Sequence, residues 1–199
     1  MFVHRIAQGL TGLVIGTLVM TGCTPPPATV APLAGSAWTT IHGEKLTMKE
    51  MMGTAGTVFI TLDPECPFCQ MYTHTISAIA AKYAGQGVNV VGLYPGHFMQ
   101  LEEVLPFSAD AGFEFPQVMD DQCKLSLALQ ARVTPECFLT DANGTVVYRG
   151  AVDDRAVRQG QKKYQAQQHH LAHAIEAFLT TGEPQQEVVA VGCIVECEE

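Results

Sequence analysis

Basic side chains are scarce in this sequence. Its 199 residues include 11 lysines and arginines against 20 aspartates and glutamates, which gives a net charge of −9. No run of lysine and arginine is present that could follow a phosphate backbone, as nucleic-acid-binding proteins require. Nucleic acid is therefore not expected among the partners.

The sequence also lacks a second Cys-x-x-Cys, or a Cys-x-x-His, to accompany Cys66 and Cys69. A structural zinc ion needs four ligands, which two such pairs commonly supply. His169 and His173 are spaced i and i+4 and could hold a metal, but the polar face of a helix explains them equally well. No metal site is therefore assigned, and Cys66 and Cys69 are either a structural disulfide or a redox centre.

The longest apolar run lies at the N-terminus. His4 and Arg5 precede the mostly apolar residues 6–20, and small residues precede Cys23. This pattern resembles a bacterial lipoprotein signal, and it predicts a signal peptide over 1–22 with a lipid on the Cys23 sulfur. An uncleaved membrane anchor is the alternative.

Three prolines follow Cys23, and they predict a flexible tether over residues 23–35. In either case the domain belongs in the bacterial cell envelope, attached to the membrane and facing the extracytoplasmic side, the periplasm. That compartment is oxidising, so the remaining cysteines at 66, 69, 123, 137, 193 and 197 can form disulfides. Their even number permits pairing but does not assign it.

Cys66 and Cys69 lie where a predicted strand gives way to a predicted helix. Residues 57–62 are β-branched and apolar, which is typical of a buried strand, and helical periodicity then continues until Gly85. At the start of a helix, residues three apart are neighbours and can form a disulfide. The positive end of the helix dipole favours a thiolate there, and the thiolate is the reactive form.

The rest of the chain predicts an α/β domain. The order strand, helix, strand around Cys66 implies a parallel pair of strands with a right-handed crossover. Asp141-Ala142-Asn143-Gly144 between two apolar strands is the clearest hairpin signal. Further expected elements are a small hairpin over 33–46, a helical turn over 47–52, and strands at 88–94 and 115–119. A helix over 100–112 is expected to be broken or kinked at Pro106, and an amphipathic helix is expected over 169–180. Asp120 or Asp121 is expected to cap a helix that buries Leu125, Leu127, Ala128 and Leu129.

Thr134-Pro135 immediately before the hairpin completes a pattern that resembles the thioredoxin fold of the redoxin group. The resemblance implies a three-layer sandwich with a central mixed sheet, parallel strands and a C-terminal antiparallel hairpin. It implies that the Thr134–Pro135 bond is cis and forms a wall of the active site beside Cys66 and Cys69. The domain is expected over 36–182, followed by a C-terminal tail over 183–199.

A closer match is to exported redoxin-domain proteins. The matching motifs are Cys66-Pro67-Phe68-Cys69-Gln70, Thr134-Pro135-Glu136-Cys137-Phe138-Leu139, Tyr148-Arg149-Gly150-Ala151-Val152-Asp153-Asp154 and Val191-Gly192-Cys193. The sequence departs from thioredoxin itself, which has tryptophan where Glu65 stands and Gly-Pro between its cysteines. Thioredoxin's redox potential and partner surface therefore do not carry over.

The function that this resemblance implies is that of a membrane-tethered thiol-disulfide oxidoreductase. The Cys66 thiolate attacks a partner disulfide, and Cys69 resolves the mixed disulfide. The protein would need no cofactor other than its own Cys66–Cys69 disulfide. Its partners would be protein thiols and disulfides and an unidentified electron donor.

Four further residues are candidates for accessory roles. Asp63 and Glu65 either tune the thiols and shuttle protons, or are a turn residue and a solvated carboxylate. Cys137 is either a third redox cysteine or a small buried residue on a core strand. Cys193 and Cys197 would be about 13 Å apart in an extended chain at roughly 3.3 Å per residue, too far to bridge. The tail is therefore expected to fold back so that Cys193 pairs with another cysteine.

Three other functions stay open. A copper chaperone would use two cysteines with a distant histidine, but its cysteines are separated by three residues and here by two. A thiol peroxidase would have threonine and proline three and seven residues before its cysteine, where this chain has Asp63 and Phe59. The third is a lipoprotein without enzymatic activity, stabilised by a disulfide.

Overall fold

A computed structural model describes residues 26–197 of the chain. The predicted signal peptide and Cys23 lie outside this range. Within it, no helix has both the length and the apolar character needed to cross a membrane.

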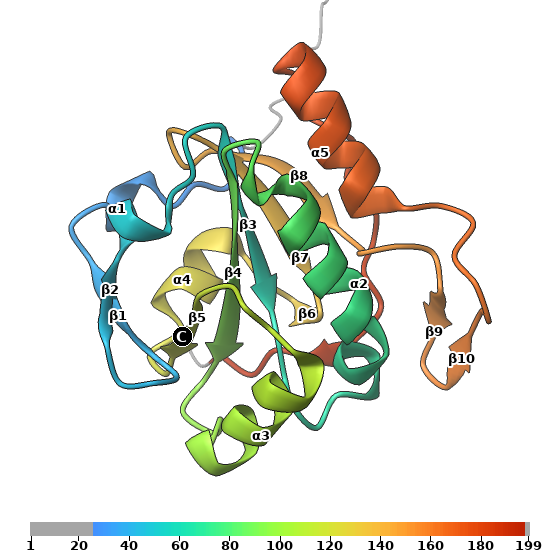
Figure 1. Cartoon of the computed structure of the whole chain (residues 1–199), viewed down its shortest axis with the longest axis horizontal. Coiled ribbons are helices and arrows are strands. Elements are labelled where there is room, and N and C mark those ends of the chain that lie inside the picture. Colours follow the sequence, from blue (N-terminus) through green and yellow to red (C-terminus); the bar gives the residue numbers. More distant parts are fainter. Residues whose placement is uncertain (1–25, 198–199) are drawn as a thin grey trace, which may run out of the picture.

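A seven-stranded mixed sheet forms the centre of the molecule (Figure 1). Its strand order is β2-β1-β5-β4-β3-β7-β8, in which β3, β4 and β5 are parallel and the other neighbours are antiparallel. The crossover predicted around Cys66 and the antiparallel C-terminal hairpin are therefore confirmed. The strands are β1 (Ala37–Thr40), β2 (Lys45–Thr47), β3 (Gly56–Thr61), β4 (Val88–Pro95), β5 (Gln117–Asp120), β7 (Cys137–Asp141) and β8 (Val146–Gly150).

Helices cover both faces of this sheet, which gives the predicted three layers. The side chains of β3 alternate between two hydrophobic clusters, with Val58 and Ile60 in one and Phe59 in the other. The first cluster includes α2 (Pro67–Ala84), α3 (Leu101–Ala111) and α5 (His170–Thr181), and the second includes α1 (Met48–Met51) and α4 (Lys124–Leu129). Burial on both faces explains why β3 and β4 are continuously apolar.

One local expectation is narrowed and another needs correction. Pro106 lies inside α3, which is one helix over Leu101–Ala111 and not two pieces, because a proline removes one backbone hydrogen bond while the other turns persist. Leu127 is exposed, whereas Leu125 and Leu129 are fully buried, because α4 is short and turns Leu127 away from the sheet. Asp120, not Asp121, accepts hydrogen bonds from the first amides of α4.

Part of the segment predicted to be a flexible tether, residues 23–35, is packed against the domain. Val30 is 1% exposed, and its N–H donates to the carbonyl oxygen of Gly144 in the β7–β8 turn. A short 3-10 helix, η1 (Ala31–Leu33), follows. The apolar side chain of Val30 belongs to the second cluster, which explains why this segment is held against the domain.

The C-terminal tail returns to the domain and crosses the end of the sheet (Figure 1, red). Val188 exchanges backbone hydrogen bonds with β8, from its N–H to Arg149 and from the N–H of Ala151 to its carbonyl. Further on, β11 (Cys193–Ile194) pairs antiparallel with β6 (Val133–Thr134). The remaining strands, β9 (Ala156–Arg158) and β10 (Gln161–Lys162), form a separate two-stranded ribbon.

Candidate redox site

The two cysteines of the Cys-x-x-Cys motif lie at the start of α2. Cys66 is the residue that caps the helix, with φ −75° and ψ 115°, and Pro67 occupies the first helical position. Proline fits there because the first N–H groups of a helix have no acceptor within it. Cys69 is fully buried and Cys66 is 1% exposed, and both carry free thiols.

The cis-proline loop forms the opposite wall. The Thr134–Pro135 peptide bond is cis, which confirms the prediction. The Cys66 thiol donates to the Thr134 carbonyl oxygen, with 3.0 Å between sulfur and oxygen. The Thr134 hydroxyl is buried, and within residues 26–197 it has no hydrogen-bond partner at standard geometry. The cis-proline loop and the start of α2 are distant in sequence, and together they place the polar groups of Thr134 directly beside the Cys66 sulfur.

A buried ion pair that sequence reasoning did not predict holds this loop. The fully buried Glu136 carboxylate accepts hydrogen bonds from the Arg132 backbone N–H at 2.8 Å and from its guanidinium at 2.6 and 3.1 Å. The Glu136 N–H donates to the Thr61 hydroxyl at the end of β3. The loop is therefore tied both to itself and to the strand that leads to Cys66. The sequence signal for this ion pair was the single carboxylate of Glu136 at the start of an otherwise apolar strand, because a buried carboxylate needs a partner.

The two thiols have opposite acidities. The neighbouring Cys69 thiol is the largest cause that lowers the pKa of Cys66, and Cys193, the backbone N–H of Cys69 and Thr134 add to it. These contacts outweigh burial and bring the pKa of Cys66 to about 4. Burial raises the pKa of Cys69 well above the ordinary value, and the neighbouring Cys66 raises it further. Cys66 is thus the thiolate and Cys69 the proton donor at neutral pH.

The tail brings a third cysteine to the same place. Cys193 pairs in register with Thr134, whose carbonyl oxygen lies 3.0 Å from the Cys66 sulfur, so the two cysteines flank the same residue. Burial raises the pKa of Cys193 to about 12, with the Cys66 hydrogen bond and charge contributing. Gly192 permits this approach, because a Cβ at that position would overlap the carbonyl oxygen of Thr134. The Val191-Gly192-Cys193 motif therefore belongs to the site.

A pocket of about 470 Å³ opens beside the cysteines. Cys193 lines it, whereas Cys66 does not. Its lining includes four acidic residues and no lysine or arginine among the described residues, together with the exposed apolar side chains of Phe98 and Ile194. The acidic residues are Asp63, Glu65, Glu103 and Glu196. The solvent-facing sulfur of this site is thus that of Cys193, in an acidic and partly apolar surface.

The other candidate residues take different positions. Asp63 accepts from the Glu65 N–H at 2.8 Å, as a turn residue does, and burial raises its pKa, with the charge of Cys66 contributing. Glu65 is exposed. Cys137 is fully buried on β7, and burial raises its pKa well above the usual value, so the structure supports the interpretation as a core residue.

The Tyr148 to Asp154 motif holds the polypeptide that follows the sheet. The Tyr148 hydroxyl donates to the Ala151 carbonyl at 2.7 Å. The buried Asp153 carboxylate accepts from the Arg155 backbone N–H and guanidinium, and its carbonyl accepts from Tyr72 on α2. The motif thus connects β8 to the back of α2 and does not contribute side chains to the pocket.

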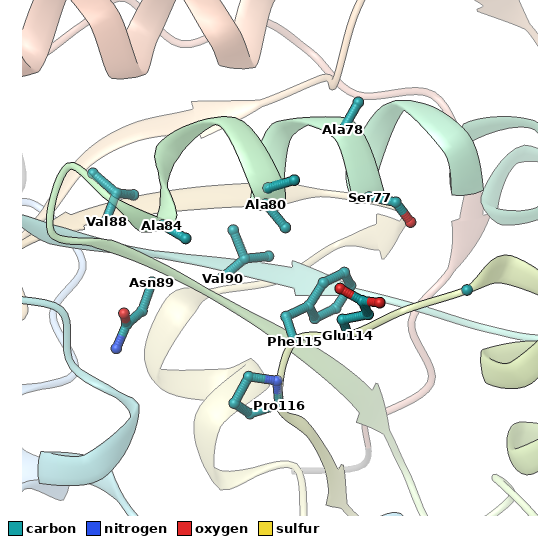
Figure 2. Close-up of a pocket in the computed structure, with 12 residues that line it drawn as sticks. Ser77, Ala78, Ala80, Ala84, Val88, Asn89, Val90, Glu114, Phe115 and Pro116 are labelled. Carbon is teal, nitrogen blue, oxygen red and sulfur yellow. The ribbon is translucent and has the colours of Figure 1, made fainter.

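No arrangement suited to a metal ion is present in the described part of the chain, where groups of three or more His, Cys, Asp or Glu side chains do not converge. His169 and His173 do lie together, with ring centroids 6.2 Å apart. A larger pocket of about 600 Å³ lies between α2, β4 and the segment before β5 (Figure 2). Small residues such as Ala80, Ala84 and Val90 line it, and it contains no cysteine, so it is separate from the redox site.

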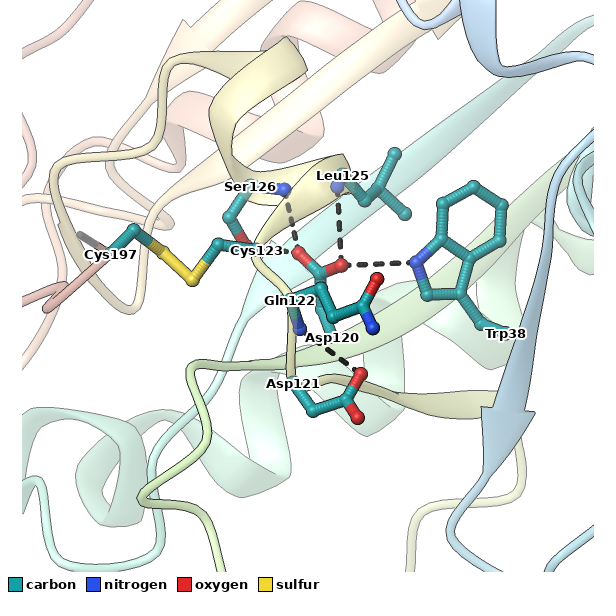
Figure 3. The surroundings of a disulfide bond; sticks show 8 residues. All are labelled: Trp38, Asp120, Asp121, Gln122, Cys123, Leu125, Ser126 and Cys197. Atoms are coloured by element: carbon teal, nitrogen blue, oxygen red, sulfur yellow. Dashed lines mark hydrogen bonds between the residues drawn. A yellow bond between two sulfur atoms is a disulfide. The ribbon is translucent and has the colours of Figure 1, made fainter. Parts of the chain in front are cut away.

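Cys123 and Cys197 form a disulfide across a separation of 74 residues (Figure 3). The tail does fold back as predicted, but Cys197 is the bonded cysteine and Cys193 remains a free thiol. Cys123 lies directly before α4, beside the Asp120 carboxylate, which accepts from Trp38 and from the amides of Leu125 and Ser126. The bond therefore attaches the end of the tail to a rigid part of the domain.

Comparison with known proteins agrees with this architecture. A hypothetical protein, SMc02350, from Sinorhizobium meliloti 1021 is 25% identical with a TM-score of 0.74, over 86% of this chain and 94% of its own. A putative thioredoxin from Neisseria meningitidis is 17% identical (TM-score 0.57; 75% and 90% covered), and a putative thiol:disulfide interchange protein DsbE from Chlorobium tepidum is 20% identical (0.53; 63% and 84%). The domain therefore has the thioredoxin fold.

The family follows from the sequence match. The model of the AhpC/TSA family matches residues 28–149, and the chain belongs to that family. The matched range contains Cys66, Cys69, Thr134 and Pro135 but ends before the tail that carries Cys193. No curated protein matches the sequence.

Proposed function

We propose that this protein is a thiol-disulfide oxidoreductase that acts on protein disulfides through Cys66 and Cys69. The observation that carries the proposal is the pairing, at one helix start, of a Cys66 whose pKa is about 4 with a buried Cys69 whose pKa is raised. A low-pKa thiol attacks a disulfide as a thiolate, and a protonated neighbour resolves the mixed disulfide once the first charge is gone.

The chemistry proceeds in two exchange steps. The Cys66 thiolate attacks one sulfur of the partner disulfide, a Cys66–partner disulfide forms, and the second partner sulfur leaves as a thiolate that takes up a proton. Cys69 then loses its proton and attacks Cys66, which forms the Cys66–Cys69 disulfide and releases the partner as a dithiol. An electron donor must reduce this disulfide before the next cycle. In this scheme Thr134 and Pro135 hold the partner's backbone, and the Asp63 carboxylate, whose pKa is raised by burial, accepts the Cys69 proton.

The pocket indicates which partners fit. Its four carboxylates repel small anionic thiols such as glutathione, and its exposed apolar side chains suit a polypeptide. We infer that partner segments with neutral or basic residues around their cysteines react fastest.

Two variants test the proposed reaction. Cys66→Ser is expected to abolish reduction of insulin by the protein, while Cys137→Ser, a matched change of a buried thiol, retains it. Cys69→Ala is expected to trap a detectable fraction of the partner as a mixed disulfide, because one resolving thiol is removed, and mass spectrometry can identify that partner. Full insulin reduction by Cys66→Ser would contradict the proposal.

We further propose that a lipid on Cys23 attaches the mature protein, residues 23–199, to the membrane on the periplasmic side. The support is the sequence pattern before Cys23 and the Cys123–Cys197 disulfide, a bond that forms and persists in oxidising compartments. Incorporation of labelled palmitate in the producing bacterium is expected to disappear with Cys23→Ala. Equal labelling of that variant would contradict lipidation at this residue.

Peroxide reduction is the second candidate, because the AhpC/TSA family match and the low pKa of Cys66 both favour it. The threonine and proline that shape a peroxide pocket are replaced by Asp63 and Phe59, and a carboxylate repels a peroxide anion and competes for its hydrogen bonds. We therefore expect hydrogen peroxide to oxidise Cys66 no faster than an ordinary thiolate. Rapid, saturable consumption of hydrogen peroxide would favour peroxide reduction over disulfide exchange as the function.

A further inference from the structure

The tail occupies the edge of backbone that a partner's strand would need. The β6 segment Val133–Thr134 lies beside Cys66, and β11 pairs antiparallel with it, Cys193 opposite Thr134 and Ile194 opposite Val133. An additional hydrogen bond runs from the Val195 N–H to the Arg132 carbonyl at 3.0 Å. Addition of a strand to an exposed edge is a common mode of peptide recognition. The tail thus lies where an extended partner would bind.

Cys193 also lies where the partner's sulfur would have to be. It is paired with Thr134, whose carbonyl oxygen is 3.0 Å from the Cys66 sulfur, and it lines the pocket that Cys66 does not reach. Cys66 is only 1% exposed in this arrangement, so a partner disulfide reaches it only when the tail moves or through the sulfur of Cys193. Tail and cysteine together occupy the place of a substrate.

We propose that Cys193 is a third redox-active cysteine, which forms a disulfide with Cys66 and competes with Cys69 to resolve mixed disulfides. The inference rests on the proposed oxidoreductase function. The proposal also gives the Val191-Gly192-Cys193 motif a role. Only glycine at residue 192 permits the close approach to Thr134 that places the Cys193 sulfur near Cys66.

The exchange is balanced without any reagent other than the partner disulfide. After Cys66 has attacked the partner and one partner thiolate has left, Cys193 releases its proton to that thiolate or to water. The Cys193 thiolate attacks the Cys66 sulfur, the Cys66–partner bond breaks, and the second partner sulfur leaves and is protonated. Cys66 and Cys193 have then lost two electrons, and the partner disulfide has become two thiols.

The order of these steps follows from the contacts. While Cys66 is a thiolate, its hydrogen bond and charge keep Cys193 protonated. Formation of the mixed disulfide removes that charge, so Cys193 becomes easier to ionise at the moment when a resolving thiolate is needed. Cys69 also becomes easier to ionise when the charge of Cys66 is removed. It stays fully buried, however, whereas Cys193 lines the open pocket.

The test uses cystamine, a small cationic disulfide suited to the acidic pocket, and the mature chain with its Cys123–Cys197 bond intact. In Cys69→Ala we expect cystamine to produce a Cys66–Cys193 disulfide, detected by mass mapping of non-reduced peptides, with release of both cysteamine molecules. Cys69→Ala with Cys193→Ser is expected to retain a cysteamine adduct on Cys66. Serine keeps a hydrogen-bond donor beside Cys66, so the comparison changes only the ability to form a disulfide. Cys69→Ala with Cys137→Ser should behave like Cys69→Ala alone.

The outcomes separate this inference from the function on which it rests. A stable cysteamine adduct on Cys66 in Cys69→Ala, with Cys193 still a free thiol, overturns the role of Cys193 and leaves the role of Cys66 intact. Failure of cystamine to react with Cys66 in every variant overturns both. A second readout is trapping of protein partners, which we expect to rise about tenfold or more when Cys193→Ser is added to Cys69→Ala, since the remaining resolving thiol is removed. Equal trapping by the two variants would also contradict the inference.

Discussion

The pKa of Cys66 is lowered by groups that come from three separate parts of the chain. Cys69 belongs to the same helix turn, Thr134 to the cis-proline loop, and Cys193 to the tail. Each of them favours the thiolate over the thiol, and together they outweigh the burial that would favour the neutral form. The acidity of this residue is thus a property of the assembled fold, and the helix position alone would give only part of it.

The thiolate absorbance of the reduced protein is expected to titrate with a midpoint near pH 4, and Cys66→Ser should lack this transition. The folded pKa is below the unfolded value of 9.0, so ionisation of Cys66 stabilises the folded reduced protein. This contribution is complete above about pH 9 and is lost as the pH falls toward 4. Urea unfolding of both proteins across this range measures it, and parallel pH profiles would contradict it.

Cys193 contributes to this pKa through its thiol, which gives a matched pair of variants. Cys193→Ala removes the hydrogen-bond donor, so the midpoint of Cys66 should move to higher pH. Cys193→Ser keeps a donor and should shift it less. The absorbance titration distinguishes them, and identical midpoints in both variants and the native chain would show that the tail does not stabilise the thiolate.

At the scale of the elements, the cis-proline loop depends on a buried charge. The side chain of Arg132 is 48% exposed, but its partner Glu136 is fully buried. Arg132→Ala leaves this carboxylate without its counterion, and loss of one partner of a buried pair typically costs about 3 kcal/mol or more. We expect a decrease of this order in the free energy of unfolding, measured with denaturant.

Lys82→Ala is the control for this variant. Lys82 pairs with Glu176 at 2.6 Å, but both side chains are more than half exposed. Exposed ion pairs contribute little because water screens them. Unfolding of Lys82→Ala should therefore resemble that of the native chain, and an equal loss in the two variants would show that burial of Glu136 is not the cause.

The pairing of β11 with β6 depends on the absence of a side chain at residue 192. In Gly192→Ala the Cβ would overlap the Thr134 carbonyl oxygen. Overpacking of this kind costs about 1–3 kcal/mol, enough to raise the population of the displaced tail roughly tenfold or more. Alkylation of Cys66 by a maleimide should accelerate accordingly. Gly85→Ala, where a Cβ meets nothing within 4 Å, is the control and should leave the rate unchanged.

Local patterns in the sequence predict the elements that local forces determine. The strand before Cys66, the Asn143-Gly144 turn and the cis-proline position follow from residue types at short spacing, together with the family pattern. The partners of Cys193 and Cys197 do not, because their positions depend on the path of a tail that bonds to β8, β6 and α4 in turn. The exposure of Leu127 could not be predicted either. It depends on how α4 is oriented against the sheet, which the sequence of α4 alone does not determine.

At the scale of the whole molecule, one disulfide closes most of the C-terminal half into a loop. Cys123 and Cys197 are 74 residues apart, and the loop contains the cis-proline wall, the hairpin and α5. In the chain-entropy description, a loop of this length stabilises the folded state by about 4 kcal/mol through its effect on the unfolded chain.

Replacement of both Cys123 and Cys197 by serine should therefore lower the denaturant midpoint of unfolding clearly. Cys193→Ser changes a cysteine of the same tail that is not bonded in this form, and it should leave the midpoint nearly unchanged. The reduced native chain should unfold like the double variant. Equal midpoints with and without the bond would contradict this account.

The tail between Val188 and Cys197 is fixed at both ends, by backbone bonds to β8 and by the disulfide to Cys123. A thiol held on so short a segment faces Cys66 at an effective concentration in the millimolar range or above. Free thiols in solution would have to exceed that concentration to compete for Cys66. A partner reacts with Cys66 at lower concentration only if its own binding displaces the tail. The affinity of the partner for the surface around Cys66 would therefore decide which partner reacts, more than the reactivity of the partner's thiol.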